Sequence, residues 1–113
     1  MSGILCAVAA SGAVKVDLST YSQIVSGGGS ATWTFTAVTA TVSGGTASAY
    51  NWVVNQNFGS GVMSILSGQG TSSCTVRVTG CLIGDTNDGT LTCTATVGGV
   101  GYNSPPCDLQ YTR

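Results

Sequence analysis

The sequence contains no histidine and no glutamate, and only 6% of its 113 residues are charged. Without an imidazole, the chain cannot build the Ser-His-Asp or Cys-His arrangements that activate a nucleophile, nor a zinc site with His ligands. Its only cations are Lys15, Arg77 and Arg113, too few to neutralise the phosphates of a nucleic acid. We therefore expect no catalysis, no cofactor, no metal and no nucleic-acid partner.

Long apolar runs are also absent. The longest, from Ile4 to Ala10, has seven residues, whereas a membrane-spanning helix needs about 20. The start of the chain lacks the basic residues that open a secretory signal. We expect neither membrane insertion nor a cleaved leader.

Serine, threonine and glycine are abundant instead. Ser and Thr together number 30 and Gly 17. Threonine and valine are stiff at χ1 and suit pleated strands, while the glycine clusters lie about 8 to 15 residues apart, as turns do in an all-β sandwich. The length fits one domain. The sequence predicts strands at residues 13–18, 31–42, 49–54, 63–66, 73–79, 90–97 and 106–112.

Apolar and polar residues alternate within several of these segments, so that one face of each strand is apolar. Tyr50, Trp52 and Val54 share one face of the third predicted strand. In the second, the apolar positions change parity between Ala37 and Val38, which predicts a bulge or a change of sheet at that point.

The sequence pattern that begins at Trp52 resembles that of the immunoglobulin fold. About forty residues later comes Asn87-Asp88-Gly89-Thr90-Leu91-Thr92-Cys93, which is similar to the pattern in which a Trp of strand C packs on a Cys of strand F. Two features of the pattern are missing. Leu91 stands where a tyrosine corner would place its tyrosine, and the Cys of strand B would fall near Val38, where the chain has none.

The chain also resembles a narrower group, the small immunoglobulin-like proteins of tailed bacteriophages. The resemblance covers roughly residues 13 to 113 and rests on Val38 to Val42, Ser43 to Thr46, Tyr50 to Trp52 and the final alternation of Leu109, Tyr111 and Arg113. It implies a non-enzymatic virion protein, assembled in the cytoplasm of a bacterial host, that is associated with the tail or decorates the capsid. The expected architecture is an immunoglobulin-like sandwich of about seven strands in residues 13–113, preceded by an N-terminal arm in residues 1–12.

The arm is a candidate for assembly contacts. It is uncharged and includes Ile4, Leu5 and Val8, whose burial against a neighbouring subunit would offset the cost of ordering it. A frayed terminus or part of a first strand would explain the same residues. Because the exterior is poor in charge, we expect contacts with copies of the same chain and with other virion proteins.

Two other classes of function fit the composition. Tyr21, Phe58 and Tyr102, all expected in loops, could supply the exposed rings of a module that binds cell-surface glycans. A secreted bacterial surface or pilus-like subunit is a further alternative, and it would require disulfides within the chain.

The five cysteines are odd in number, so they cannot all pair within one chain. Cys74 and Cys93 lie on apolar faces and are expected to be buried thiols. Cys81 and Cys107, near strand ends, form the pair expected to bridge if any does, and Cys6 is left over.

The segment Asp85 to Gly89 partly resembles the start of a calcium-binding loop. Its spacing differs from the EF-hand pattern, which also needs a distant glutamate. We expect a turn, in which Gly89 supplies a special backbone dihedral.

Overall fold

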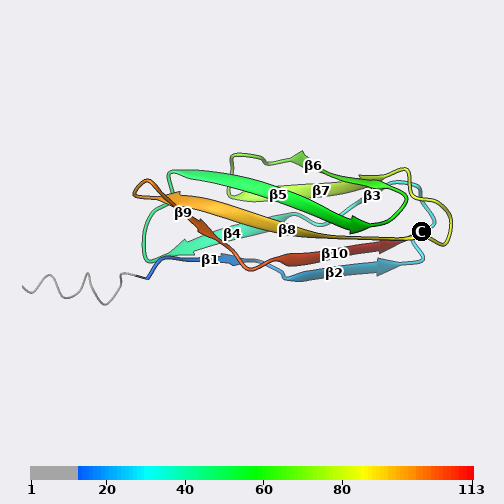
Figure 1. Cartoon of the computed structure of the whole chain (residues 1–113), viewed down its shortest axis with the longest axis horizontal. Helices are drawn as coiled ribbons and strands as arrows, with labels where there is room; N and C mark the ends of the chain where they lie inside the picture. Colours follow the sequence, from blue (N-terminus) through cyan, green and yellow to red (C-terminus); the bar gives the residue numbers. More distant parts are fainter. Residues whose placement is uncertain (1–12) are drawn as a thin grey trace, which may run out of the picture.

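A computed structural model describes residues 13–113, and the protein is all-β over this range, with no helix. None of these residues forms a helix that could cross a membrane. Figure 1 shows two layers of strands that run along a common long direction. The strands are β1 (Lys15–Leu18), β2 (Ser22–Ser26), β3 (Trp33–Thr34), β4 (Val38–Ser43), β5 (Ala49–Phe58), β6 (Val62–Ser67), β7 (Ser73–Thr79), β8 (Thr86–Val97), β9 (Val100–Asn103) and β10 (Cys107–Thr112).

The strand order is that of an immunoglobulin-like sandwich. One sheet has the order β1-β4-β7, with β3 and β6 also paired to β7, and the other has the order β2-β10-β8-β5, with β9 paired to β8. β3 and β4 act as one interrupted strand, as do β9 and β10, while β1 and β2 divide the first strand between the two sheets. This arrangement corresponds to the ABED and CFG sheets of the constant-type immunoglobulin fold. The predicted fold class is confirmed.

The interruption between β3 and β4 occurs where the apolar parity changes. Thr34 pairs with Arg77 and Val38 with Cys74, so three residues on one strand face two on the other. That count is the mark of a β-bulge. The extra residue lets Phe35 and Val38 both point into the core, as the sequence pattern predicts.

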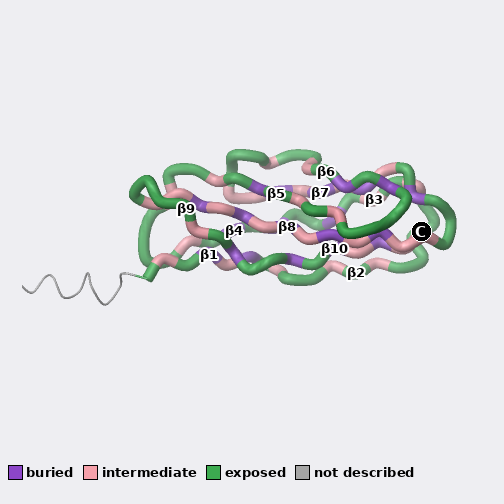
Figure 2. The backbone as a smooth tube through the Cα atoms, viewed as in Figure 1, coloured by how far each residue is buried: buried purple, intermediate pink, exposed green. Residues whose placement is uncertain are grey.

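The core lies between the sheets around Trp52, which is fully buried and pairs with Cys93. Alternate residues of β7, β8 and β10 point into it, and their threonine and other polar neighbours are half-buried or exposed (Figure 2). Val38, at the place of the missing strand B cysteine, is a buried hydrophobic residue opposite Cys74. Apolar packing therefore occupies the position where many immunoglobulin domains have a disulfide.

Two strands were not predicted, and two extend beyond their predicted limits. β2 and β9 are short edge segments without regular apolar alternation, so their sequences lack a strand signal. β5 continues to Phe58, and β8 begins at Thr86. The predicted turn over Asp85 to Gly89 is therefore wrong, since most of that segment is strand.

Gly89 is needed for packing and has no left-handed backbone dihedral. A Cβ atom there would lie 2.7 Å from the Met63 sulfur and 2.8 Å from the backbone oxygen of Asn55. The glycine allows β6 and β5 to approach β8 closely.

Candidate interaction surface

One end of the sandwich is built from two loops that hydrogen-bond to each other. The turn between β5 and β6 (residues 59–61) packs against the loop between β7 and β8 (residues 80–85). The backbone N–H of Leu82 donates to the Ser60 hydroxyl at 3.0 Å, and the Ser60 N–H donates to Oδ2 of Asp85 at 2.7 Å. These bonds fix the position of one loop relative to the other.

Buried bonds support the same end of the molecule. The Gly61 N–H donates to Oδ1 of the fully buried Asn87 at 2.7 Å. The Arg113 guanidinium donates to the Cys81 carbonyl at 2.8 Å, and the Gly84 N–H donates to the Arg113 carbonyl at 3.0 Å. Both loops and the last residue of the chain are therefore tied to the framework.

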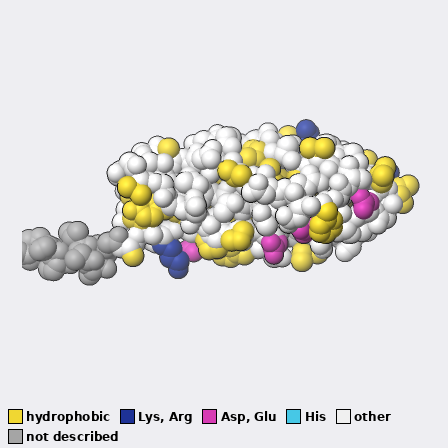
Figure 3. All heavy atoms as spheres, in the orientation of Figure 1, with side chains coloured by type: hydrophobic (Ala, Val, Ile, Leu, Met, Phe, Trp, Pro, Cys, Tyr) yellow, Lys and Arg dark blue, Asp and Glu magenta, His cyan; other side chains and the backbone are white. Residues whose placement is uncertain are grey.

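Four large apolar side chains are exposed at this end: two lie in the loop between β7 and β8, one ends β5 and one begins β6. The exposed fractions are 55% for Phe58, 62% for Val62, 65% for Leu82 and 84% for Ile83. We call these four residues the apolar tip. Figure 3 shows hydrophobic atoms at the right-hand end of the molecule. Leu82 and Ile83 are adjacent in one loop, whereas Phe58 and Val62 lie on the outer faces of different sheets. Single exposed apolar residues are common on proteins, but several at one end are a candidate contact surface.

Two carboxylates lie beside the apolar tip. Hydrogen bonds from the Ser60 side chain and then the Ser60 backbone lower the pKa of Asp85, which keeps it ionised at neutral pH. Oδ2 of Asp88 accepts a hydrogen bond from the Asn57 amide at 2.8 Å. Both carboxylates are therefore already bonded within the domain, as is the Arg113 guanidinium beside Cys81.

The arm residues Ile4, Leu5 and Val8, like Cys6, lie outside the described residues. The chain enters the structure beside Gly44, whose positive φ and lack of a side chain let it pack against the Ala13 carbonyl. Next to it, a Cβ on Gly45 would lie 2.6 Å from Val97. Ala13 is thus at the end where β8 finishes, whereas the apolar tip is at the end where β8 begins.

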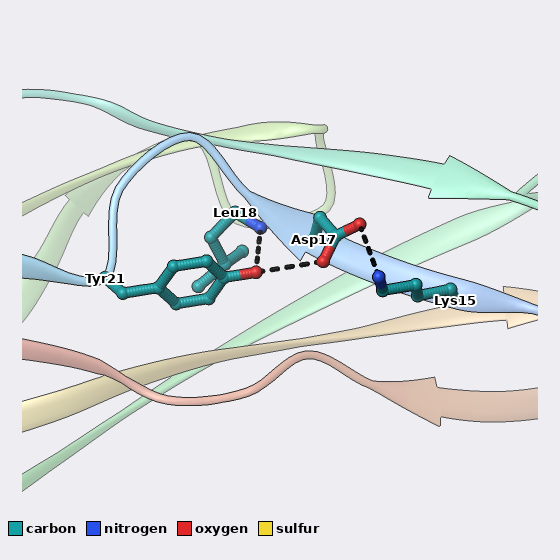
Figure 4. Close-up of polar contacts among 4 residues, drawn as sticks. All are labelled: Lys15, Asp17, Leu18 and Tyr21. Atoms are coloured by element: carbon teal, nitrogen blue, oxygen red, sulfur yellow. Dashed lines mark hydrogen bonds and ion pairs between the residues drawn. The ribbon is translucent and has the colours of Figure 1, made fainter.

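The three aromatic residues considered for glycan binding occupy different kinds of position. Tyr21 precedes β2, where its hydroxyl accepts a hydrogen bond from the Leu18 N–H and donates one to Asp17, which is also paired with Lys15 (Figure 4). The expectation that all three lie in loops is wrong for the other two. Phe58 ends β5, and Tyr102 is half-buried in β9.

The structure does not bring these rings together. Along β8, Phe58 pairs opposite Asp88 and Tyr102 opposite Ala95. Seven residues of strand separate those partners, which corresponds to about 23 Å. Phe58 and Tyr102 therefore cannot belong to one sugar-binding platform, and Phe58 is instead part of the apolar tip.

Four cysteines are described, and all four are buried free thiols. The predicted pairing of Cys81 with Cys107 is wrong. Cys81 is next to Gly61, which bonds to Asn87, whereas Cys107 pairs opposite Leu91. These places on β8 are four residues, or about 13 Å, apart, beyond the reach of a disulfide.

Burial raises the pKa of Cys74, Cys93 and Cys107 to about 11. A charge on Cys93 would further raise the pKa of Cys74, which indicates that the two thiols are close together in the core. All three remain protonated at neutral pH and act as small apolar side chains.

Sequence reasoning missed Leu82 and Ile83. Their signal was two consecutive bulky aliphatic residues in a short loop between Gly80 and Gly84, where a buried position is hard to provide.

No pocket and no group of three potential metal ligands occurs within residues 13–113. Comparisons of the chain with family models, curated proteins and solved structures gave no match.

Proposed function

We propose that this protein is a structural component of a tailed-bacteriophage virion, associated with the tail, and that it acts through protein-protein contacts. The observation that carries the contact function is the apolar tip. Phe58, Val62, Leu82 and Ile83 are held in exposed positions by loops that are hydrogen-bonded to each other and to the framework. A surface held in this way loses little conformational freedom when a partner covers it.

The energy available at the apolar tip is adequate for a specific contact. Covering one large apolar side chain contributes about 1.5 to 3 kcal/mol, and four such residues are exposed at this end of the sandwich. Part of this gain offsets the translational and rotational freedom that the two partners lose on association. The scarcity of charge also favours contact, since the centres of protein interfaces are depleted in charged residues. Within residues 13–113 there is one ion pair, Lys15 with Asp17.

The assignment to a virion is supported by the sequence resemblance to phage immunoglobulin-like proteins, with which the strand order of the two sheets agrees. A capsid decoration protein would share the same fold and composition. The two locations place the protein on different parts of the particle, so microscopy separates them.

An antibody against the full chain, detected with gold in electron micrographs of particles from a lysate of the organism that carries the gene, tests the proposal. Label on the tail supports it, and label on the capsid assigns a decoration role instead. Particles that contain the other virion proteins but bind no antibody would contradict a role in the virion.

The contribution of the apolar tip is tested in the same particles. Incorporation should fall for a chain with Leu82→Lys and Ile83→Lys. Val53→Lys is a control, because Val53 is 42% exposed in the middle of β5, opposite Thr92, and farther from the loops at this end. Equal incorporation of both variants would show that the apolar tip is not the contact surface.

A further inference from the structure

We infer that the apolar tip of one copy binds the N-terminal arm of a second copy, so that the chains join head to tail. This inference rests on the proposed function, because it names the partner of the same surface. The occupant is the uncharged arm segment with Ile4, Leu5 and Val8. The receiving surface is centred on Leu82 and Ile83 in the loop between β7 and β8.

Distance excludes binding of the apolar arm residues to Leu82 and Ile83 of their own chain. The eleven steps from Val97 to Thr86 along β8 correspond to about 36 Å, and the loop that carries Leu82 lies beyond Thr86. Ile4 precedes Ala13 by nine residues, which reach at most about 32 Å when fully extended. Leu5 and Val8 reach less far. These arm residues can therefore meet Leu82 and Ile83 only on another copy.

The arrangement in space favours such a contact. Figure 1 shows that β1 begins at one end of the sandwich, whereas the loop after β7 lies at the other end, near the C-terminus. An arm at one end and a receptor at the opposite end allow every copy to use both surfaces at once. Two different surfaces make a heterologous contact, which produces an open chain or a closed ring of copies.

Charge also favours this occupant. Asp85 and Asp88 lie beside the apolar tip and already have hydrogen-bond partners within the domain. The Arg113 guanidinium is likewise bonded, to the Cys81 carbonyl. Residues 1–12 contain no charged side chain, so the arm brings no like charge and leaves no ion unpaired. An anionic lipid surface would instead be repelled by these carboxylates.

Sedimentation velocity of the full chain, measured over a range of concentrations, tests the inference. Reductant is included because Cys6 in the arm could otherwise link copies covalently. The wild-type chain should show species larger than a monomer that increase with concentration. A receptor variant (Leu82→Lys with Ile83→Lys) and an arm variant (Ile4→Lys with Leu5→Lys) should each reduce the association constant at least about a hundredfold, since each removes two large apolar side chains from the contact.

Two controls keep the comparison specific. Val53→Lys adds a charge at an exposed apolar residue in the middle of β5, and Ser2→Lys with Ser11→Lys adds two charges to the arm without removing apolar residues. Both should associate more strongly than the two test variants. Far-ultraviolet circular dichroism should show the same β spectrum for all of the chains.

Mixing the two defective variants gives the sharpest result. The receptor variant keeps a normal arm, and the arm variant keeps a normal apolar tip, so an equal mixture should form a one-to-one dimer although each alone is a monomer. If the arm variant associates as well as wild type, copies meet tip to tip and the inference is wrong. A wild-type chain that stays monomeric at every concentration also overturns it, while gold label on particles would still support the proposed function.

Discussion

The side-chain amide of Gln69 pairs with both backbone polar groups of Trp52. Its Oε1 accepts a hydrogen bond from the Trp52 N–H at 2.7 Å, and its Nε2 donates one to the Trp52 carbonyl at 2.8 Å. β5 is the last strand of its sheet, so these groups have no neighbouring strand. One glutamine side chain therefore supplies the bonds that a further strand would make.

Two other glutamines act in the same way. Gln23 on β2 accepts a hydrogen bond from the Thr36 N–H and donates one to the Thr36 carbonyl, at the bulge between β3 and β4. Gln56 on β5 accepts from the Met63 N–H and donates to the Gly61 carbonyl. Each amide links one sheet to the other, and together they satisfy edge groups that would otherwise be open to pairing with another chain.

We predict that Gln69→Ala lowers the free energy of unfolding by about 1 to 3 kcal/mol, because it leaves two partly buried backbone groups without partners. Denaturation in urea measures the loss. Gln110→Ala is the matched control, since Gln110 is half-buried on β10 and its side chain makes no hydrogen bond. A loss no larger for Gln69→Ala than for Gln110→Ala would show that the paired amide adds nothing.

The Tyr111 hydroxyl makes a second testable contact. It accepts a hydrogen bond from the Ser30 N–H at 3.1 Å and donates one to the Ser30 carbonyl at 2.6 Å, while its ring stacks on Trp33 at a centroid distance of 5.2 Å. Tyr111→Phe should cost about 1 to 3 kcal/mol of stability and retain the near-ultraviolet dichroism of the stacked rings. Tyr50→Phe, which removes a hydroxyl without a hydrogen-bond partner in the structure, should cost less. The reverse order would contradict this role of the hydroxyl.

Gly89→Ala should destabilise the protein by about 1 to 3 kcal/mol, because the added methyl group meets the Met63 sulfur and the backbone of β5. Gly101→Ala is the control: its nearest contact would be the Thr94 methyl carbon at 3.2 Å, and its φ is not in the left-handed region. Thermal unfolding of both variants measures the difference. Equal melting temperatures would show that the contact between β6 and β8 tolerates an added methyl group.

The buried thiols predict how stability depends on pH. Cys74, Cys93 and Cys107 have pKa values near 11 in the folded protein, above the ordinary value of 9.0. Between these values the unfolded chain loses protons that the folded chain retains, so the free energy of unfolding should fall as pH rises from about 9 to 11. Below pH 9 the contribution of the thiols should be constant.

Urea denaturation in reducing buffer at several pH values measures this dependence. Cys107→Ala removes one of the three thiols and should decrease the slope between pH 9 and 11, whatever its effect at pH 8. An unchanged slope would mean that Cys107 does not contribute. The three thiols should also react slowly with alkylating reagents in the folded state and quickly in denaturant, since reaction requires the thiolate.

Alternation and turn residues were sufficient to predict the fold class and most of the core. Cys74, Val76 and Val78 are buried on β7 as their spacing indicates, and the bulge before Val38 follows from a change of parity that is visible in the chain. The same method failed for β2. That strand has little apolar pattern, and it forms because β10 offers a parallel partner more than eighty residues away.

The candidate site was less predictable than the core. The aromatic residues chosen from the sequence are spread over different parts of the sandwich. The apolar tip was overlooked because Phe58 and Val62 are far in sequence from Leu82 and Ile83. Hydrogen bonds from Ser60 join the two loops, and no local pattern indicates that they meet.

The sequence alone determined which side of each regular strand is apolar and where the chain turns, because both depend on neighbouring residues and on backbone sterics. It also determined the low charge that leaves the surface suited to contact. Only the tertiary structure decided that the four cysteines within residues 13–113 stay unbonded, that glutamine amides close the edges, and that four apolar residues share one end. Those outcomes depend on distances between segments that are remote along the chain.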